Sequence, residues 1–502
     1  MSSASACSGR APPGEDMMSY RSSITSSAAL IAAGIFIVSL AIGMAFRHHY
    51  WDDPFIVSVY ARNLIRGNGL VFNHGERVLG ITTPLYTLVV ALTGLFFPDI
   101  PTLSCIISAF STALLGIFIF YGATVGEDWI GGAVCAALVI LSANSYMYVG
   151  IETYFYAMLV YGSFCLFCHG NYGSASVLAA LGVLARPDGV LAALILLTSY
   201  LVKERRFPAT YSVLFLLITL PWAAFAYYYY GDILPQTFYA KKGSISHHQY
   251  LNEYVIRGIG GWIFSRNQQN LPFPPFILPV IGLVCGARRS LFLRLSYIHA
   301  IAMIAGYVII SPEDPWHSYP VMVAAFLSLG FGIYQVADWV GALFKPWAYW
   351  NFARAITASL LALPILLWQF SDLENIRDGY AHTWLGGPRH KAYVQTAQWL
   401  NNNAAPGATV LTLEPGTMAF YSKCVFYDYW GLISRKGWKI SWRDAPRGLR
   451  PDYIIWNNAE KEDAYPVPDG YILRRVIEVS PFPRIFISEK RTPLNVERRS
   501  RR

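Results

Sequence analysis

The first residues that could do chemistry are two adjacent carboxylates, Asp52 and Asp53, directly after a long apolar run. A carboxylate beside a bilayer is costly to desolvate, so its presence there indicates a function. One such acid can act as a general base, and two together can bind Mg²⁺ or Mn²⁺ through their oxygens. The alternative is a pair of solvated acids at a helix end, with Asp53 before Pro54 as a cap. The residues alone leave both interpretations open.

Two further features place polar groups beside apolar runs. The segment 50–83 holds several turn-forming glycines together with Glu76, a mixture typical of the rim of an active site. Glu152 lies inside an otherwise apolar stretch, where an isolated glutamate needs a partner or a function. The structural alternative for Glu152 is the first residue of a helix at the membrane interface.

The elements that must position these residues are mostly apolar. The chain has 502 residues, of which 54% are hydrophobic and 14% charged, against about 25% charged in soluble proteins. The mean hydropathy is +0.36. These values exclude a disordered protein, a disulfide scaffold and a typical cytosolic enzyme, and they indicate a polytopic membrane protein. The seven cysteines show no disulfide or metal-ligand spacing, and we interpret Cys165 and Cys168, in an apolar stretch, as small buried hydrophobes.

Apolar runs predict about eleven membrane-spanning helices. The first run, 24–46, is longer than the core of a signal peptide, so we expect an uncleaved span with the N-terminus inside. Further runs lie near 84–97, 103–125, 130–149, 152–169, 174–186, 188–201, 209–230, 273–287, 291–311, 316–338 and 353–370. Several are shorter than the roughly 20 residues that a span needs, and 84–97 and 174–201 leave the count open.

Basic residues predict which loops face the cytoplasm. Clusters of Lys and Arg mark three such loops, 203–206, 288–294 and 345–354. The polar segments between them then face outward; these are 50–83, 231–272 and 312–316. The tail after residue 370 faces outward as well.

The number of spans must also agree with this orientation. Residue 52 is outside and residue 203 inside, so an odd number of spans separates them. We therefore expect 84–97 to lie in the interface, or to dip in and return. This arrangement puts Glu152 and the 186–189 turn on the outer face, and loops 126–129 and 170–173 carry no Lys or Arg that would test it.

Charge separates the membrane body from the tail. Residues 1–374 carry 19 Lys/Arg and 18 Asp/Glu, a net charge of +1, whereas residues 375–502 carry 20 and 12, a net of +8. We expect four parts: a cytoplasmic leader (1–23), a transmembrane domain (24–374), a small outward-facing α/β domain (375–490) and a disordered basic end (491–502). Within the α/β domain the pattern predicts a helix over 392–402 and strands over 408–413, 453–456, 476–479 and 485–487.

The order of residues from Asp52 onward resembles the first external loop of GT-C fold glycosyltransferases. The shared pattern is DD-x-[FY]-I-x-x-x-Y-x-x-N-L-x-x-G-x-G-L-V-F-N-x-G-E-R-V-x-G-x-T-x-P-L. It is most similar to the bacterial branch that includes the mycobacterial arabinofuranosyltransferases of cell-wall arabinan. Similar strings recur along most of the chain, at 150–153 (GIET), 186–189 (RPDG), 234–241 (LPQTFYAK), 407–411, 416–421 and 428–432.

One part of the loop departs from the family pattern. The family has V-E-G-Y-T-N-P, whereas this chain has VLGITTP, with Leu79, Ile81 and Thr83 in place of an acid, an aromatic and an amide. The difference leaves the sugar and the acceptor open, but not the class of reaction.

The resemblance implies a GT-C-like transmembrane domain and an inverting transfer of a sugar from a polyprenyl-phosphate donor. That displacement needs one base for the acceptor hydroxyl, and the phosphate leaving group needs no general acid, unlike glycoside hydrolysis with its two carboxylates. By position in the motif we expect Asp52 to be the base. We expect Asp53 to orient the acceptor or a divalent cation, Mg²⁺ or Mn²⁺.

The donor phosphate requires positive charge near the membrane surface. The candidates are Arg186, Lys241, Lys242 and His317. Arginine suits bidentate phosphate binding and lysine acts as a point charge. The structural alternatives are a snorkelling arginine at a helix end, ordinary loop lysines and a structural histidine. Glu152 and Glu76 are further candidates for substrate contact.

Two other functions compete with an enzyme. A transporter or flippase of lipid-linked glycans needs polar groups at the midplane and open to both faces, whereas most polar groups here lie in outer loops. A glycan-binding protein anchored by its spans would not need eleven of them. We expect a glycosyltransferase of the bacterial inner membrane, whose partners are a polyprenyl-phosphate sugar, a cell-envelope glycan or glycolipid acceptor and membrane lipids, with no nucleic acid.

Overall fold

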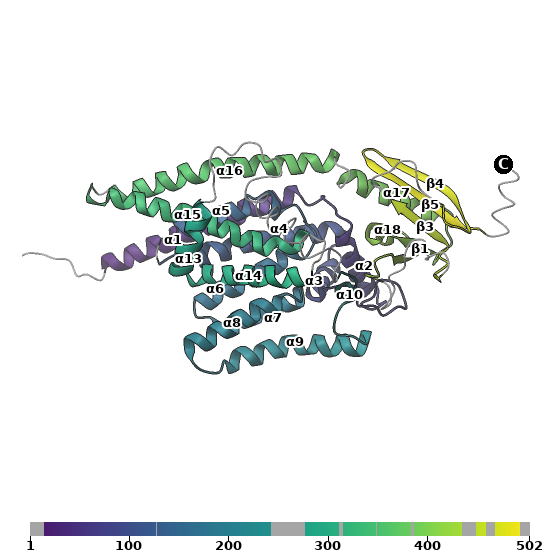
Figure 1. Cartoon of the computed structure of the whole chain (residues 1–502), viewed down its shortest axis with the longest axis horizontal. Coiled ribbons are helices and arrows are strands. Elements are labelled where there is room, and N and C mark those ends of the chain that lie inside the picture. Colours follow the sequence, from purple (N-terminus) through teal and green to yellow (C-terminus); the bar gives the residue numbers. More distant parts are fainter. Residues whose placement is uncertain are drawn as a thin grey trace, which may run out of the picture.

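The computed structural model describes residues 15–126, 128–241, 277–310, 315–347, 349–382, 386–433, 448–457 and 467–491. Helices make up the body, and a small sheet lies beyond one end of them (Figure 1). The helices of the body are α1 (Glu15–Ala45), α2 (Asp53–Ile65), α3 (Pro84–Gly94), α4 (Ile100–Ala123), α5 (Ile130–Ile140), α6 (Thr153–Cys168), α7 (Tyr172–Ala185), α8 (Gly189–Glu204), α9 (Ala209–Tyr230), α10 (Gln236–Lys241), α13 (Ile277–Arg289), α14 (Leu291–Ile310), α15 (Tyr319–Leu343) and α16 (Trp350–His382), with short 3₁₀ turns η1 (Ala143–Ser145), η3 (Pro315–Ser318) and η4 (Lys345–Trp347).

The length and composition of these helices suit a membrane. Among the described residues, six helices are long and apolar enough to cross one: α1, α4, α9, α14, α15 and α16. Four shorter apolar helices of 10–17 residues pack among them: α3, α5, α6 and α7. The predicted class, a helical multi-span membrane protein, is confirmed. The total of about eleven spans stays a prediction, because α3 and α5, with 11 residues each, reach only about 16 Å of a roughly 30 Å hydrocarbon core.

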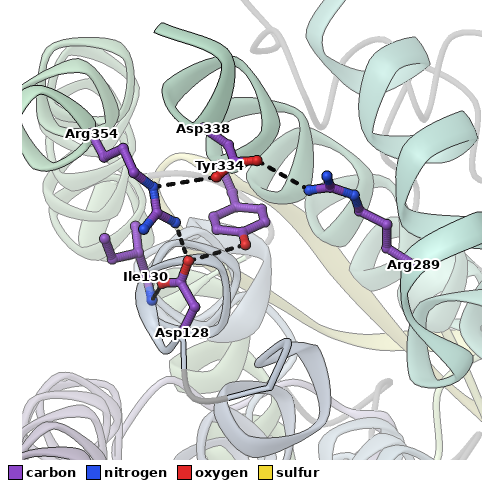
Figure 2. Close-up of polar contacts among 6 residues, drawn as sticks. All are labelled: Asp128, Ile130, Arg289, Tyr334, Asp338 and Arg354. Carbon is purple, nitrogen blue, oxygen red and sulfur yellow. Dashed lines mark hydrogen bonds and ion pairs between the residues drawn. The ribbon is translucent and has the colours of Figure 1, made fainter. Parts of the chain in front are cut away.

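An ionic cluster joins four helices at the end of the bundle remote from the sheet (Figure 2). Arg354 pairs with Asp128 and lies 3.4 Å from Asp338, which also contacts Arg289 at 3.2 Å. Tyr334 donates its hydroxyl to Asp128 at 3.1 Å. The turn before α5 therefore lies with the basic loops at the ends of α13, α15 and α16.

The C-terminal α/β domain contains a five-stranded sheet in the order β2-β1-β3-β5-β4. Its elements are α17 (Gly387–Asn403), β1 (Thr409–Thr412), α18 (Gly416–Tyr421), β2 (Val425–Asp428), β3 (Tyr453–Asn457), β4 (Tyr471–Val479) and β5 (Phe482–Lys490). Strand β1 is parallel to β2 and β3, and β5 is antiparallel to β3 and β4. The predicted helix and four strands are confirmed. Strand β2 and helix α18 were not predicted.

The segment 50–83, predicted above to be the first outer segment and called so below, packs against this domain. Tyr60 and Phe72 belong to one buried hydrophobic cluster with Tyr393 and Phe426 of the domain. The Asn73 amide donates to the Phe426 carbonyl at 2.8 Å and accepts from its N–H at 3.2 Å, so Asn73 pairs with β2 as another strand would. The core of the α/β domain thus continues into a segment that precedes it by more than 300 residues.

Candidate functional site

A cavity of about 380 Å³ lies where the end of the helical bundle meets the C-terminal domain. Its polar lining includes Asp53, Thr82, Thr83, Glu152, Arg186, Asp188, Thr237, Tyr307 and His317. Its apolar lining includes Ile56, Val57, Leu191, Met303, Ile310 and Leu432. Such a lining suits a molecule that joins a charged group to an apolar chain. Of the predicted site residues, Asp53, Glu152, Arg186 and His317 come from distant segments and meet here.

Arg186 is the centre of the polar lining. It ends α7 in an extended conformation and is 2% exposed. Its Nε and Nη2 donate to the two oxygens of Asp188 at 3.2 and 2.9 Å. Nη2 also donates to the Tyr307 hydroxyl at 2.7 Å and lies 2.5 Å from Nδ1 of His317. The ring of Tyr156 lies under the guanidinium, 4.9 Å from its carbon.

Arg186 and Tyr307 stabilise the ionised form of Asp188. Burial alone would raise the pKa of Asp188, but the charge of Arg186 and a hydrogen bond from Tyr307 outweigh it and hold that pKa below its ordinary value. Asp188 is therefore an anion, and the pair with Arg186 is formally neutral. Sequence reasoning named Arg186 but not Asp188, although Asp188 lies two residues away in the same turn.

Three buried polar atoms of the lining have no hydrogen-bond partner among the described residues. They are Nη1 of Arg186, Oγ1 of Thr83 and Oγ1 of Thr237. A buried polar group left unpaired costs about 1–3 kcal/mol, so unpaired groups around one cavity indicate where a polar ligand binds. Arg186 thus keeps one unpaired N–H group next to the cavity that it lines, while Asp188 holds its Nε–Nη2 edge.

The structure separates the two adjacent carboxylates. Asp53 is the first residue of α2 and lines the cavity. Asp52 is not part of that lining and is 3% exposed. Its oxygens accept the N–H groups of Gly416 at 3.0 Å and Thr417 at 2.8 Å, at the start of α18. The expectation that Asp52 is the base does not fit this position, because neighbouring helical residues point about 100° apart and only Asp53 faces the cavity.

Asp52 belongs to a buried ionic cluster of the C-terminal domain. Burial raises the pKa of Asp52, the charge of Glu414 raises it further, and Arg389 opposes both. Glu414 in turn pairs with Arg389 and accepts the hydroxyl of Tyr393. The position of Asp52 is therefore fixed by the C-terminal domain, which also contributes Leu432 to the cavity.

The other predicted residues lie elsewhere. Glu76 accepts hydrogen bonds from the Tyr427 hydroxyl at 2.9 Å and the Asn73 amide at 3.3 Å, so it joins the first outer segment to β2 and does not line the cavity. Lys241 is the last residue of α10. Its side chain and the whole of Lys242 lie outside the described residues.

A divalent cation held jointly by Asp52 and Asp53 does not fit this arrangement. Both oxygens of Asp52 accept N–H donors, and only Asp53 reaches the cavity. Within the described ranges no group of three or more His, Cys, Asp or Glu side chains is arranged to hold a metal.

The fold defines a class, a multi-span helical membrane protein with a C-terminal α/β domain over one end of the bundle. It is similar to two solved structures of ArnT from Cupriavidus metallidurans. The first, in the apo state, has a TM-score of 0.59 at 14% identity and covers 92% of this chain and 98% of that one. The second, bound to undecaprenyl phosphate, has a TM-score of 0.55 at 14% identity and covers 92% and 97%. At this identity the likeness shows the fold.

Sequence comparison adds one match. Residues 375–493 match a family described as a domain of unknown function, DUF8728. The comparison with curated proteins found no match.

Proposed function

We propose that this protein is a membrane glycosyltransferase that takes a sugar from a polyprenyl-phosphate donor. The observation that carries the proposal is the unpaired Nη1 of Arg186, buried on a cavity that also holds Asp53 and much apolar lining. A phosphate with an isoprenoid chain needs these features together: a guanidinium edge for the anion and apolar contacts for the chain. The likeness to ArnT, solved with undecaprenyl phosphate, supports the donor class, and the pattern from Asp52 onward supports the reaction class.

The chemistry would proceed by a single displacement. Asp53 takes the proton from an acceptor hydroxyl, whose oxygen then bonds to the anomeric carbon of the donor sugar. The bond from that carbon to the phosphate oxygen breaks, and polyprenyl phosphate leaves as an anion near Arg186. Because attack and departure are on opposite faces of the carbon, the anomeric configuration inverts.

The orientation is part of the proposal. Loops rich in Lys and Arg lie at the end of the bundle that carries the cluster of Figure 2, and the C-terminal domain lies beyond the other end. By the positive-inside rule the basic end is cytoplasmic, so the cavity and the α/β domain face the periplasm or its equivalent. The acceptor would be a cell-envelope glycan or glycolipid, and the sugar arabinofuranose or another pentose or hexose.

The position of the polar groups favours an enzyme over a transporter. Asp53, Glu152, Arg186 and His317 lie at helix ends or in turns, and the C-terminal domain adds Leu432 to the same cavity. A transporter would carry such groups on broken helices near the midplane.

The test is incubation of the purified full chain in lipid nanodiscs with a panel of polyprenyl-phosphate sugars and glycan acceptors. Released polyprenyl phosphate and the glycosylated acceptor are measured by mass spectrometry. We expect acceptor-dependent release for one donor. A parallel reaction in EDTA decides whether a divalent cation is needed. The proposal fails if the folded protein releases polyprenyl phosphate from no member of the panel.

A further inference from the structure

A second cavity, of about 650 Å³, lies beside the first outer segment and the junction of α9 with α10. Its polar lining comes from Arg77, Tyr230, Asp232 and Gln236. None of these four residues lines the first cavity. The reaction proposed above therefore gives them no role.

The two cavities share a thin wall. Val78 and Leu79 line the second cavity, whereas the next residues, Gly80 to Thr83, line the first. The N–H of Gln236 donates to the Leu79 carbonyl at 2.8 Å and closes the wall against α10. The two cavities are therefore neighbours, because consecutive residues of one segment line first one and then the other.

Aromatic rings of α9 hold the side chain of Arg77, which lines the second cavity. The guanidinium of Arg77 lies over the ring of Tyr229, 4.6 Å from its centroid. That ring stacks on Phe225 with a centroid distance of 5.0 Å and an angle of 15°. A Cβ at Gly69, where φ is +87°, would lie 2.5 Å from the Tyr229 hydroxyl, so glycine is needed for the ring to pack there. Arg77 is therefore presented in a preorganised, planar form.

The charges of the lining indicate the class of ligand. Arg77 supplies hydrogen-bond donors, and Asp232, which accepts from the Leu234 N–H at 3.1 Å and the Tyr239 hydroxyl at 3.3 Å, supplies carboxylate acceptors. A lone phosphate would be attracted by Arg77 but repelled by Asp232. A neutral molecule rich in hydroxyl groups uses both, since each hydroxyl donates and accepts.

We propose that the second cavity binds the glycan chain of the acceptor, beyond the sugar unit whose hydroxyl enters the first cavity. The proposal rests on the proposed function, because it assigns the site to the acceptor of that transfer. It predicts that the protein prefers oligosaccharide acceptors to single sugars. Arg77 and Asp232 are then specificity-determining residues that touch the acceptor away from the reacting atoms.

The test compares long and short acceptors in full-length Arg77→Ala and Asp232→Asn proteins. The probes are synthetic hexasaccharides of arabinofuranose and of mannose, with the corresponding monosaccharide glycosides. Loss of one or two hydrogen bonds to hydroxyls should raise KM for the preferred hexasaccharide about tenfold. KM for the monosaccharide and for the donor should not change. Arg66→Ala is the matched control, because Arg66 is exposed on the same segment and does not line either cavity.

Two results would overturn the glycan site. One is an unchanged KM for the hexasaccharide in both variants. The other is an equal loss for long and short acceptors with a raised KM for the donor, which would assign Arg77 to donor binding. If the wild-type protein transfers no sugar at all, the proposed function fails, and titration of the hexasaccharides into the donor-free protein still decides the site. A Kd weakened about tenfold by Arg77→Ala supports it, and an unchanged Kd or no binding refutes it.

Discussion

Asparagine substitutions at the two adjacent acids should have different effects. Asp53→Asn removes the only one of the two carboxylates that lines the cavity. General-base catalysis contributes about 10²–10⁴-fold to a rate, so transfer should fall by that factor while the KM for the donor changes little. Asp52→Asn should leave the rate of sugar transfer almost unchanged and weaken the contact between the C-terminal domain and the segment 50–83.

The size of the second effect follows from the contacts of Asp52. Its carboxylate accepts two backbone N–H groups, at 3.0 and 2.8 Å. A hydrogen bond to a charged group contributes about 1.5–3 kcal/mol. An asparagine can accept one of the two, and loss of the charge relieves a desolvation cost, since burial raises the pKa of Asp52. We therefore expect a net loss of about 2 kcal/mol, which corresponds to about 30-fold faster opening.

Hydrogen exchange of the Gly416 and Thr417 amides measures this opening directly. In Asp52→Asn their exchange should accelerate about 30-fold, with little change in kcat, and in Asp53→Asn it should stay at the wild-type rate. The reasoning is refuted if Asp53→Asn transfers sugar normally. It is also refuted if Asp52→Asn abolishes transfer while these amides remain protected, which would return the role of base to Asp52.

Two further predictions concern single side chains. Arg186→Lys keeps a charge but loses the planar guanidinium whose Nε and Nη2 hold Asp188 and whose Nη1 is unpaired beside the cavity, so kcat/KM for the donor should fall about 10–100-fold; unchanged donor kinetics would contradict this. Burial lowers the pKa of His390, packed 4.8 Å from Tyr50 and 5.4 Å from Phe55 between ring centroids, to about 4. The histidine of the unfolded chain titrates near pH 6.5, so protonation favours the unfolded state below that pH. The free energy of unfolding is therefore highest above pH 6.5 and decreases by on the order of 3 kcal/mol as the pH falls to 4. Thermal unfolding against pH checks it, since His390→Phe should flatten the slope; equal slopes would exclude His390 as the cause.

Apolar periodicity and basic loops were enough to predict the membrane body and the grouping of its loops. Glu152 and the turn of Arg186 were predicted to lie on the same face as Asp53, and all three line one cavity. That prediction needed only the number of spans and the charges of loops, which are properties of the local sequence.

The division of roles between Asp52 and Asp53 could not be predicted in the same way. Both are acids in one motif, and their difference depends on Gly416, 364 residues further along the chain. The same holds for Glu76. The pattern of its loop predicts a position at the rim of an active site, but its hydrogen bond with Tyr427 places it between the segment 50–83 and strand β2. Leu432 lies in the family-like string 428–432, but that pattern gave it no role, because a leucine in a tail looks the same whether or not it closes a cavity. Contacts between distant segments decide these positions, and no local pattern reports them.

The packing of the α/β domain against the first outer segment also has a consequence for biosynthesis. Asp52 leaves the ribosome early, but the amides of Gly416 and Thr417 that hold it are made 364 and 365 residues later. The partner of Asn73 in β2 arrives 353 residues after it. Until then this segment has neither its buried cluster nor the wall that Leu432 adds. A growing chain, or one truncated before residue 416, thus lacks a finished cavity, and the cavity is completed only after the C-terminal domain has been made and has folded against the segment 50–83.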